Sequence, residues 1–367
     1  MRVLMVTPCF LPEIGGVERH VQEVASRLTA SGCEVTVLTT DRSRRLPASE
    51  TRDGFEVRRV NAWPRQSDFH LAPALGRRIV EDRWDVVHVQ SYHTFVAPHA
   101  MWAATRRGLP FVLTFHGGGH SSRTRHLLRG TQRAALRPLL ARARRLVAVA
   151  EFEVDLYGRE LRLPRDRFVV IPNGTDLPKP VTSPPADGGV LIASVGRLER
   201  YKGHHRAIAA LPHLLQHEPR ARLWIAGSGP YEGRLRRVAE RCGVADRVEI
   251  KAVPAGDREG MAAALARASL VVLLSEFETH PIGALEARAL DLPLVVADTS
   301  GLRELAARGE ARAVPLDASP REVAAAMLQQ LRDPIVASAP QVFTWDDCAS
   351  ELRTLYRTVA EEAACAS

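Results

Sequence analysis

Short runs of hydrophobic residues alternate with amphipathic stretches along almost the whole chain. Each run has the length of a buried β-strand, and stretches such as VERHVQEVASRLTASG, from Val17, have the spacing of a surface helix. Strands that alternate with helices form parallel sheets covered by helices on both faces. The pattern therefore predicts an α/β fold of the doubly wound type.

The strand-like runs fall into two groups separated by residues 178–189, PKPVTSPPADGG. This segment is rich in Pro, Gly and Ser, which indicates a linker between domains. The runs of the first group begin at Val3, Val35, Phe55, Asp85, Pro110, Arg145 and Arg167. Those of the second group begin at Val190, Arg222, Val248, Leu270, Pro293 and Ala311.

The 367 residues suggest two domains of ordinary size. We expect the first to cover residues 1–178 and the second residues 179–341. In residues 342–367, the stretch WDDCASELRTLYRTVAEEAA has apolar residues at helical spacing and predicts a long final helix. Open parallel sheets bind ligands beyond the carboxyl ends of their strands, so we expect the site in a cleft between the domains.

Composition narrows the class of protein. The chain is 46% hydrophobic and 25% charged, as in soluble globular proteins, and no apolar run approaches the roughly 20 residues that span a bilayer. The segment MRVLMVTPCF predicts a buried first strand rather than a signal peptide. The five cysteines have no paired spacing, which predicts no disulfide framework, no zinc site and a cytoplasmic location.

The net charge of +8 comes mainly from arginine, since only Lys179, Lys202 and Lys251 are lysines. In such a chain a lysine indicates a position that favours a compact ammonium. Residues 121–145 combine dense arginine with leucine, which is typical of a helix on an anionic membrane, of contact with an acidic acceptor, or of a solvated surface. The segment lacks the aromatic residues of single-strand binders, so nucleic-acid binding is not expected.

Two cations follow the first strand of the second domain. Arg197 and Lys202 come after Gly196, and Gly203 opens the next helix. Helix N-termini present free N–H groups to anions, and arginine and lysine bind phosphate oxygens. The loop therefore predicts an anion site, with two solvated surface cations as the alternative.

The segment IAGSGPYEG has glycines at 227, 229 and 233, which only approximate a dinucleotide fingerprint. The first strand is followed by TPCFLPEIGGVERH, which has just the pair Gly15 and Gly16. We therefore do not expect NAD binding. Gly227 is predicted to let the backbone approach a ligand or turn tightly into a helix.

The stretch SEFETHPIGALEARAL, from Ser275, carries two acids. Glu278 should lie in a loop, and Glu286 about one turn into a helix that begins near Ile282. Carboxylates accept hydrogen bonds from sugar or ribose hydroxyls. If their strand lies beside the first strand of the domain, both acids share a cleft with Arg197 and Lys202, although each acid alone could be a helix cap or dipole partner.

These segments resemble the family 4 retaining glycosyltransferases, which have the GT-B fold of two Rossmann-like domains facing across a cleft. The resemblance covers nearly the whole chain, and the final helix, with Trp345 and Tyr356, is similar to the family's helix that returns to the N-terminal domain. The resemblance rests on the segments GGVERH, FHG at 115–117, IPNGTD from Ile171, VGRLERYKG from Val195 and IAGSGP from Ile225, and on the pair Glu278 and Glu286.

The resemblance implies a role for each matching residue. Arg197 and Lys202 would bind the diphosphate of a nucleotide-sugar donor, Glu278 the transferred sugar and Glu286 the ribose. The implied catalytic residues are His116, Arg197, Lys202 and Glu278. The implied donor-binding residues are Gly16, Arg197, Lys202, Gly227, Pro281, Ile282 and Glu286.

In the first domain, the resemblance implies that Gly16 approaches a phosphate or the acceptor. His116 would touch the donor sugar, and Asn173 would order the loop near the hinge. One departure lies between the two acids, where many members have Gly-Phe-Gly and this chain has residues 279–281, Thr-His-Pro. Pro281 has no N–H for a phosphate oxygen, so the departure bears on the backbone donors and on the sugar held.

The expected reaction moves a sugar to an unidentified acceptor with retention of anomeric configuration. No Asp-x-Asp occurs in the chain, so we expect no metal and no cofactor, with Arg197 and Lys202 in the role of the cation. Glu278 and Glu286 do not read as the acid pair of a glycosidase, because the ribose requires one of them. The alternatives are a sugar-nucleotide epimerase or hydrolase and a non-catalytic nucleotide-sugar-binding protein.

Overall fold

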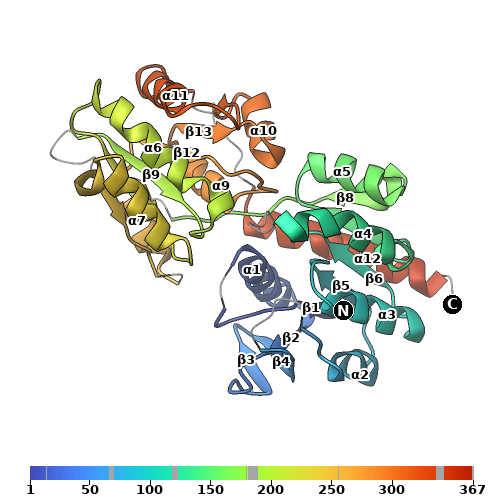
Figure 1. Cartoon of the computed structure of the whole chain (residues 1–367). Coiled ribbons are helices and arrows are strands. Elements are labelled where there is room, and N and C mark those ends of the chain that lie inside the picture. The colour runs from blue at the N-terminus through green and yellow to red at the C-terminus, as the bar shows by residue number, and fades with distance from the viewer. Residues whose placement is uncertain are drawn as a thin grey trace. The chain divides into compact units, whose positions relative to one another are not determined.

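The computed structural model describes the chain except for residues 14, 66–69, 118–122, 179, 181–188, 255, 336–342 and 366–367, and except for the side chains of residues 123–129. The chain forms two compact units (Figure 1). Unit 1 comprises Met1–Gly117, Thr124–Gly174 and Phe343–Ser367, and unit 2 is mainly Thr175–Val342. The predicted linker, residues 178–189, lies largely outside the described residues.

Unit 1 is built on an eight-stranded sheet in the order β3-β4-β2-β1-β5-β6-β7-β8. Its neighbouring strands are parallel except for the pair β3 and β4. The strands are β1 (Arg2–Val6), β2 (Glu34–Asp41), β3 (Ser49–Arg52), β4 (Phe55–Asn61), β5 (Val86–Gln90), β6 (Phe111–Thr114), β7 (Arg145–Ala148) and β8 (Phe168–Val170).

Strand β3 is absent from the sequence prediction. Its side chains are polar and mostly exposed, so the segment has no hydrophobic alternation. It pairs with β4 across Asp53 and Gly54, which both have positive φ, 47° and 85°. Asp-Gly is a strong hairpin signal because it suits a two-residue turn of this kind, and that dipeptide could have located the strand.

Helices α2 to α5 share one hydrophobic core with the unit 1 sheet. Of the remaining helices, α12 packs against α1 and also contacts β5. The final helix thus returns to the first unit as expected, with Trp345 and Tyr356 fully buried. The helices are α1 (Gly16–Ala30), α2 (Ala74–Glu81), α3 (Val96–Arg107), α4 (Arg123–Leu140), α5 (Glu151–Leu161) and α12 (Trp345–Cys365).

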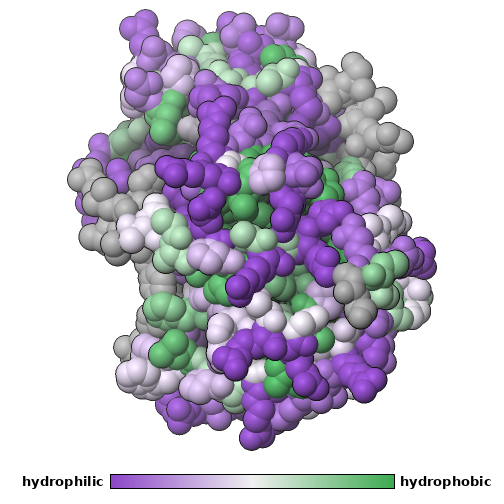
Figure 2. Space-filling view, turned by 90° about the vertical axis from the view of Figure 1, so that its right-hand side faces the viewer, coloured by the Kyte–Doolittle hydropathy of each residue, from purple (hydrophilic) through white to green (hydrophobic). Residues whose placement is uncertain are grey.

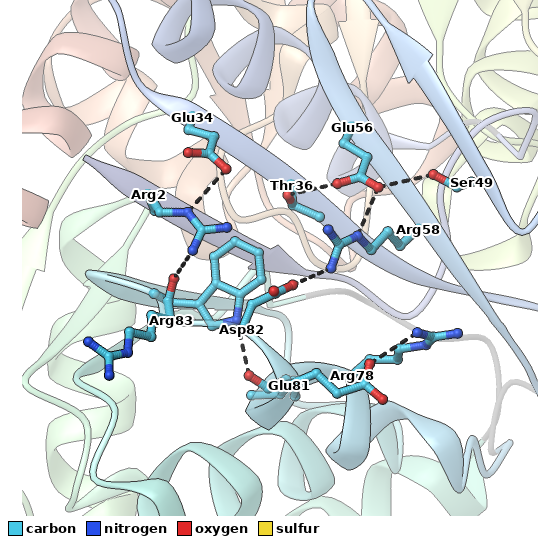
Figure 3. A network of polar contacts seen from close by, with 12 residues as sticks. Arg2, Glu34, Thr36, Ser49, Glu56, Arg58, Arg78, Glu81, Asp82 and Arg83 are labelled. Atoms are coloured by element: carbon cyan, nitrogen blue, oxygen red, sulfur yellow. Dashed lines mark hydrogen bonds and ion pairs between the residues drawn. The ribbon is translucent and has the colours of Figure 1, made fainter.

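A polar network that includes Arg2, Glu34 and Arg58 lies near the amino ends of β1 and β2 (Figure 3). The Arg2 guanidinium lies 3.1 Å from the Glu34 carboxylate, and that of Arg58 lies 2.5 Å from Asp82. Both guanidiniums stack on Trp84, 5.1 and 6.0 Å from its centroid. These contacts stabilise the edge of the sheet away from the carboxyl ends of the strands, where ligands of such sheets bind.

Unit 2 is built on a six-stranded parallel sheet in the order β11-β10-β9-β12-β13-β14. Its core clusters place α6, α7 and α11 on one face and α8, α9 and α10 on the other. The strands are β9 (Leu191–Val195), β10 (Arg222–Ala226), β11 (Val248–Ile250), β12 (Leu270–Leu273), β13 (Leu294–Ala297) and β14 (Arg312–Val314). The helices are α6 (His204–Leu215), α7 (Glu232–Arg241), α8 (Arg258–Leu265), α9 (Ile282–Ala289), α10 (Ser300–Ala307) and α11 (Pro320–Arg332).

The order of the unit 2 strands reverses between β9 and β12, which pair in parallel. In doubly wound sheets a crevice opens beyond the carboxyl ends of the two strands at such a switch point. The loops that follow these two strands carry Arg197, Lys202 and Glu278. The strand before Glu278 thus lies beside the first strand of unit 2, which is the arrangement under which the sequence predicted a shared site.

Within the described residues, no helix combines the length and apolar character needed to cross a membrane. All five cysteines are free thiols.

Candidate functional site

The loops after β9 and β12 are joined backbone to backbone. The amide of Glu276 donates to the carbonyl of Tyr201 at 2.7 Å, and the Ser275 hydroxyl oxygen lies 3.3 Å from the carbonyl oxygen of Lys202. Gly203 has a φ of 74°, and an added Cβ would lie 2.0 Å from the Leu274 carbonyl oxygen. This contact requires glycine, since any side chain would force the two loops apart.

Lys202 and Glu278 form an ion pair at this junction. The Lys202 Nζ lies 2.6 Å from the Glu278 Oε1, and both side chains are largely buried, at 17% and 12% exposed. The Ser275 hydroxyl donates to the same oxygen at 2.7 Å. Burial alone would lower the pKa of Lys202, but the attraction of Glu278 outweighs it and leaves that pKa above its ordinary value. The ammonium therefore stays charged at neutral pH.

The backbone of Glu278 is held by the start of α10. Its amide donates to the Ser300 hydroxyl at 2.8 Å, and its carbonyl accepts from the amide of Gly301 at 2.9 Å. An added Cβ on Gly301 would lie 1.8 Å from the carbonyl oxygen of Thr279. Glu278 is thus held by three loops at the carboxyl edge of the sheet, those that follow β9, β12 and β13.

Arg197 is the exposed cation of the loop. Its side chain is 64% exposed and donates to Glu199 at 3.3 Å, and it lies near enough to Lys202 to oppose the rise of the Lys202 pKa. Because its guanidinium is solvated, it can turn toward a bound anion without breaking a buried contact.

His204 was not identified from the sequence. Its buried ring lies 2.8 Å from the Ser194 hydroxyl through Nδ1 and 3.3 Å from the carbonyl of Arg197 through Nε2. Burial lowers the pKa of His204 to about 4, so the ring is neutral. Nε2 then donates to the carbonyl while Nδ1 accepts from the serine, which anchors the Arg197 backbone to β9.

The second acid, Glu286, lies on α9 and is 3% exposed. Its Oε1 lies 2.6 Å from Nη1 of Arg258, the first residue of α8. The Nε and Nη2 of Arg258 are buried and have no hydrogen-bond partner among the residues that the structure describes. Unsatisfied buried donors are costly, so these N–H groups are available to acceptor oxygens of a ligand. Nothing in the sequence distinguishes Arg258 from the other arginines; only its contact with a predicted acid does.

Helix α9 begins at Ile282, as the sequence predicted, and has no side-chain cap. The first amides of a helix have no partner within it, so this end presents donors and a partial positive charge. Pro281, at the N-cap, contributes no N–H. The neighbouring His280 is a neutral ring, because burial and then repulsion by Arg308 and Arg288 lower its pKa to about 3.

Gly227 belongs to the turn after β10. An added Cβ would lie 1.9 Å from the carbonyl oxygen of Gly196, and the amide of Gly196 donates to Ala226 at 3.0 Å. Glycine thus allows this turn to pack directly on the loop that carries Arg197.

The structure brings most predicted donor-side residues to one edge of one sheet, and the others belong to unit 1. The residues at the carboxyl edge of unit 2 are Arg197, Lys202, Gly227, Glu278, Pro281, Ile282 and Glu286. Those in unit 1 are Gly16 and His116.

His116 follows β6 and is almost fully buried, with a φ of 43°. Its Nε2 lies 2.7 Å from the Gln90 side-chain oxygen, and its ring packs edge-on against His20 at 4.6 Å. Burial, with smaller effects of the neighbouring histidines, holds the pKa of His116 well below its ordinary value. His116 is therefore a neutral hydrogen-bonding group in an unusual backbone conformation, which is common at functional sites.

Asn173 is buried, and its side-chain oxygen lies 3.0 Å from the Nδ1 of His20 on α1. The adjacent Gly174 lies against the start of α12, where an added Cβ would be 2.2 Å from the amide nitrogen of Trp345. Asn173 thus ties the segment after β8 to α1. For Gly16, the first residue of α1, no atom of the described residues lies within 4 Å of an added Cβ, so their packing does not require glycine there.

The basic segment 121–145 contains α4, although its side chains up to residue 129 lie outside the described ones. Arg133 pairs with Glu160, Arg145 with Glu362 at 2.7 Å, and Arg137 donates to the carbonyl of Leu161 at 2.7 Å. Part of the basic charge of this segment is therefore used within unit 1.

No group of three or more His, Cys, Asp or Glu side chains suited to a metal ion occurs among the residues that the structure describes. The cationic groups at the switch point are arginine and lysine side chains and a helix N-terminus.

Comparison with known proteins identifies the family. Residues 14–179 match Glycosyltransferase Family 4, and residues 180–341 match Glycosyl transferases group 1. The chain is 32% identical to a glycogen synthase of Mycobacterium tuberculosis, over 92% of this chain and 87% of that protein. It is 31% identical to a GDP-mannose:cellobiosyl-diphosphopolyprenol alpha-mannosyltransferase of Xanthomonas oryzae pv. oryzae, over 81% and 79%.

The fold is also similar to that of solved structures. Sucrose-phosphate synthase from Thermosynechococcus elongatus superimposes with a TM-score of 0.78 at 19% identity, over 98% of both chains. Two Rossmann-like units with parallel sheets constitute the GT-B architecture that the sequence predicted. The chain belongs to the family 4 glycosyltransferases.

Proposed function

We propose that the protein transfers a sugar from a nucleoside-diphosphate sugar to an acceptor hydroxyl with retention of the anomeric configuration. The observation that carries this proposal is the Lys202–Glu278 pair at the switch point of unit 2, beside the uncapped start of α9. Cations and free amides suit a diphosphate, and buried acids suit hydroxyls. One relative has GDP-mannose in its name, which agrees with a donor of this class.

In this proposal, Lys202 and Arg197 bind the diphosphate of the donor. Lys202 is enclosed and already oriented by Glu278. Arg197 is solvated, and its side chain would turn from Glu199 toward the diphosphate. Glu278 accepts hydrogen bonds from hydroxyls of the sugar, and Glu286 from those of the ribose. Gly227, Pro281 and Ile282 shape the same edge, where the α9 amides add donors for a phosphate oxygen.

Arg258 adds a group that the sequence did not predict. Its bond to Glu286 fixes the carboxylate for the ribose, and the N–H groups on its Nε and Nη2, which have no partner among the described residues, are suited to acceptor oxygens of the nucleotide. A fixed guanidinium beside a fixed acid would favour a ligand that offers an oxygen and a hydroxyl close together.

The transfer breaks the bond from the anomeric carbon to the diphosphate oxygen and forms a bond to the acceptor oxygen on the same face of the sugar. The proton of the acceptor hydroxyl goes to the departing diphosphate. Charge develops on that leaving group, and preorganised cations and amides stabilise it. In this proposal Lys202, Arg197 and the α9 start supply that charge, so no metal takes part.

In unit 1, we propose that His116 contacts the donor sugar as a neutral imidazole and that Gly16 leaves room for a phosphate or the acceptor. His116 is positioned by Gln90 and His20, and no described atom lies within 4 Å of a Cβ added to Gly16. Hydrogen bonding by a neutral ring would not require a proton to be taken up near pH 7.

The experiment is a transfer assay with UDP-, GDP-, ADP- and dTDP-sugars and a panel of sugar, polyol and lipid-linked acceptors. NMR of the product should show the anomeric configuration of the donor, and EDTA should leave the rate unchanged. An inverted product would overturn the retaining mechanism, and loss of activity in EDTA would overturn the metal-free one. Release or rearrangement of the donor sugar without any transfer would instead favour a hydrolase or an epimerase.

A further inference from the structure

Among the residues that the structure describes, the large hydrophobic side chains that unit 1 exposes lie between residues 63 and 102. The exposed fractions are 65% for Trp63, 52% for Leu71, 48% for Phe95 and 49% for Trp102. Figure 2 shows one face of the molecule, on which hydrophilic side chains predominate and hydrophobic residues are scattered among them. Exposed tryptophans concentrated in one segment indicate a contact surface.

Trp63 and Leu71 form a pair across a short antiparallel bridge. Each amide donates to the other's carbonyl, at 2.9 and 2.7 Å. Directly opposed residues of an antiparallel pair project their side chains to the same side. The connection between β4 and α2 therefore presents an aromatic and an aliphatic side chain together.

Helix α3 presents a second exposed group. Phe95, His99, Trp102 and Arg106 follow one another at helical intervals, so they share one face of the helix. The Arg106 guanidinium lies over the Trp102 ring, 5.2 Å from its centroid. This pairing keeps a cation at the surface of the exposed indole.

The two groups meet at His99. Its ring bonds to the carbonyl of Ala72, the residue after Leu71, and its Nε2 would lie 2.6 Å from a Cβ added to Gly76. On the other side, the ring lies 6.3 Å from that of Trp102. Helices α2 and α3 also lie side by side (Figure 1). We call Trp63, Leu71, Phe95 and Trp102 the aromatic patch.

The run of chain that carries α3 and α4 has charge of one sign, whereas the neighbouring α2 ends with Glu81, which pairs with Arg77 and Arg78. From Val86 to Ala150 the chain has ten arginines and no aspartate or glutamate. Arg106 and Arg107 are exposed at the end of α3. The arginine-rich α4 adjoins the start of α3, where the Gln132 side chain donates to the carbonyl of Tyr92 at 3.2 Å. The surface therefore combines exposed indoles with the exposed arginines at the end of α3.

We propose that the aromatic patch and the adjacent arginines dock unit 1 on the surface of an anionic phospholipid bilayer. Tryptophan is favoured at the level of lipid headgroups, and arginine is attracted to anionic headgroups. The exposed Arg106 and Arg107, which lie in a run of 65 residues without an acid, from 86 to 150, suit such a surface. The docking surface lies outside the residues proposed to bind the donor, so its test does not depend on transfer.

The test is co-sedimentation of the full chain with vesicles of phosphatidylcholine alone or mixed equally with phosphatidylglycerol. We expect binding to the mixed vesicles and little to the neutral ones. The double variant Trp63→Ser with Trp102→Ser should bind at least tenfold more weakly, as should Arg106→Glu with Arg107→Glu. The matched controls in unit 2 are Leu316→Ser, an exposed leucine, and Arg236→Glu with Arg237→Glu on α7, and both should bind like the wild type.

Quenching of tryptophan fluorescence by brominated lipids gives a second readout in the unaltered protein. We expect quenching that disappears in the tryptophan variant, because Trp84, Trp224 and Trp345 are buried. Circular dichroism should show the same melting temperature for all variants. The proposal is overturned if the wild type does not bind, if the control pairs weaken binding as much, or if the tryptophan variant changes self-association instead of vesicle binding.

Discussion

Lys202 and Glu278 are 76 positions apart in sequence, and their side chains meet at 2.6 Å across the two loops of the switch point. Neither charge is well solvated, so each stabilises the other in the unliganded protein. The pair also fixes the direction of both side chains before a ligand arrives. Preorganised charge of this kind is effective in catalysis because it costs no reorganisation during the reaction.

Removing either cation of this loop should slow the transfer. Lys202→Ala or Arg197→Ala should each lower kcat/KM on the order of a hundredfold, since one preorganised donor contributes roughly 3 kcal/mol. Lys202→Arg should also lose activity, because the enclosed side chain leaves little room for a guanidinium. Initial rates with a fixed donor measure this, with Arg236→Ala on α7 as a control. Near-normal turnover of both alanine variants would remove these cations from the site.

Arg258 and Glu286 should act as a unit in nucleotide binding. Arg258→Ala leaves a buried acid without its partner, and Glu286→Gln removes the charge that holds Arg258. Each change should raise the Kd for the nucleoside diphosphate about tenfold, and the double variant should show a coupling of about 0.5–3 kcal/mol. Calorimetric titration of the four proteins gives the cycle. Strictly additive effects would mean that the two side chains contribute independently.

Gly203 should be intolerant of any side chain. Gly203→Ala adds both a left-handed strain and a clash with the Leu274 carbonyl. Gly243, with a φ of 67° and no atom within 4 Å of an added Cβ, supplies a control for the strain alone. Urea unfolding should show a loss of about 1 kcal/mol for Gly243→Ala and a clearly larger loss for Gly203→Ala. Equal losses would show that the loops can separate without cost.

Stability should fall as the pH is lowered from about 6.5 toward 4. Burial, in each case the largest effect, lowers the pKa of His20 and of His204 to about 4, against 6.5 in the unfolded chain. Between these values the unfolded state binds more protons, so each histidine reduces the free energy of unfolding by up to about 1.4 kcal/mol per pH unit. Urea unfolding at pH 7 and pH 5 measures the slope, which should be shallower in His204→Gln. An unchanged slope in that variant would contradict the assignment.

The hydrophobic pattern predicted most of the fold because parallel strands buried on both faces are continuous apolar runs. In the part of the chain that the structure describes, thirteen of the fourteen strands begin within a few residues of the predicted runs, and the exception is β3. That edge strand has polar side chains, and its pairing depends on the turn at Asp53 and Gly54. Local pattern could not reveal it because edge strands need no buried face.

The candidate site was predicted where its residues are close in sequence to strand ends. Arg197, Lys202 and Glu278 follow β9 and β12, and the parallel pairing of those strands brings them together. Arg258 and His204 were not predicted, since their roles depend on contacts with Glu286 and with the Arg197 carbonyl that only tertiary structure creates. Such contacts leave no periodic signal in the sequence.

The central claim is that the switch point of unit 2 binds a nucleoside diphosphate, and calorimetric titration with UDP, GDP, ADP and dTDP tests it most directly. At least one of these should bind the wild type, and the double variant Arg197→Ala with Lys202→Ala should bind it at least a hundredfold more weakly. The charge-matched pair Arg236→Ala with Arg237→Ala, on exposed positions of α7, should bind like the wild type. Equal affinity of the two double variants would contradict the account.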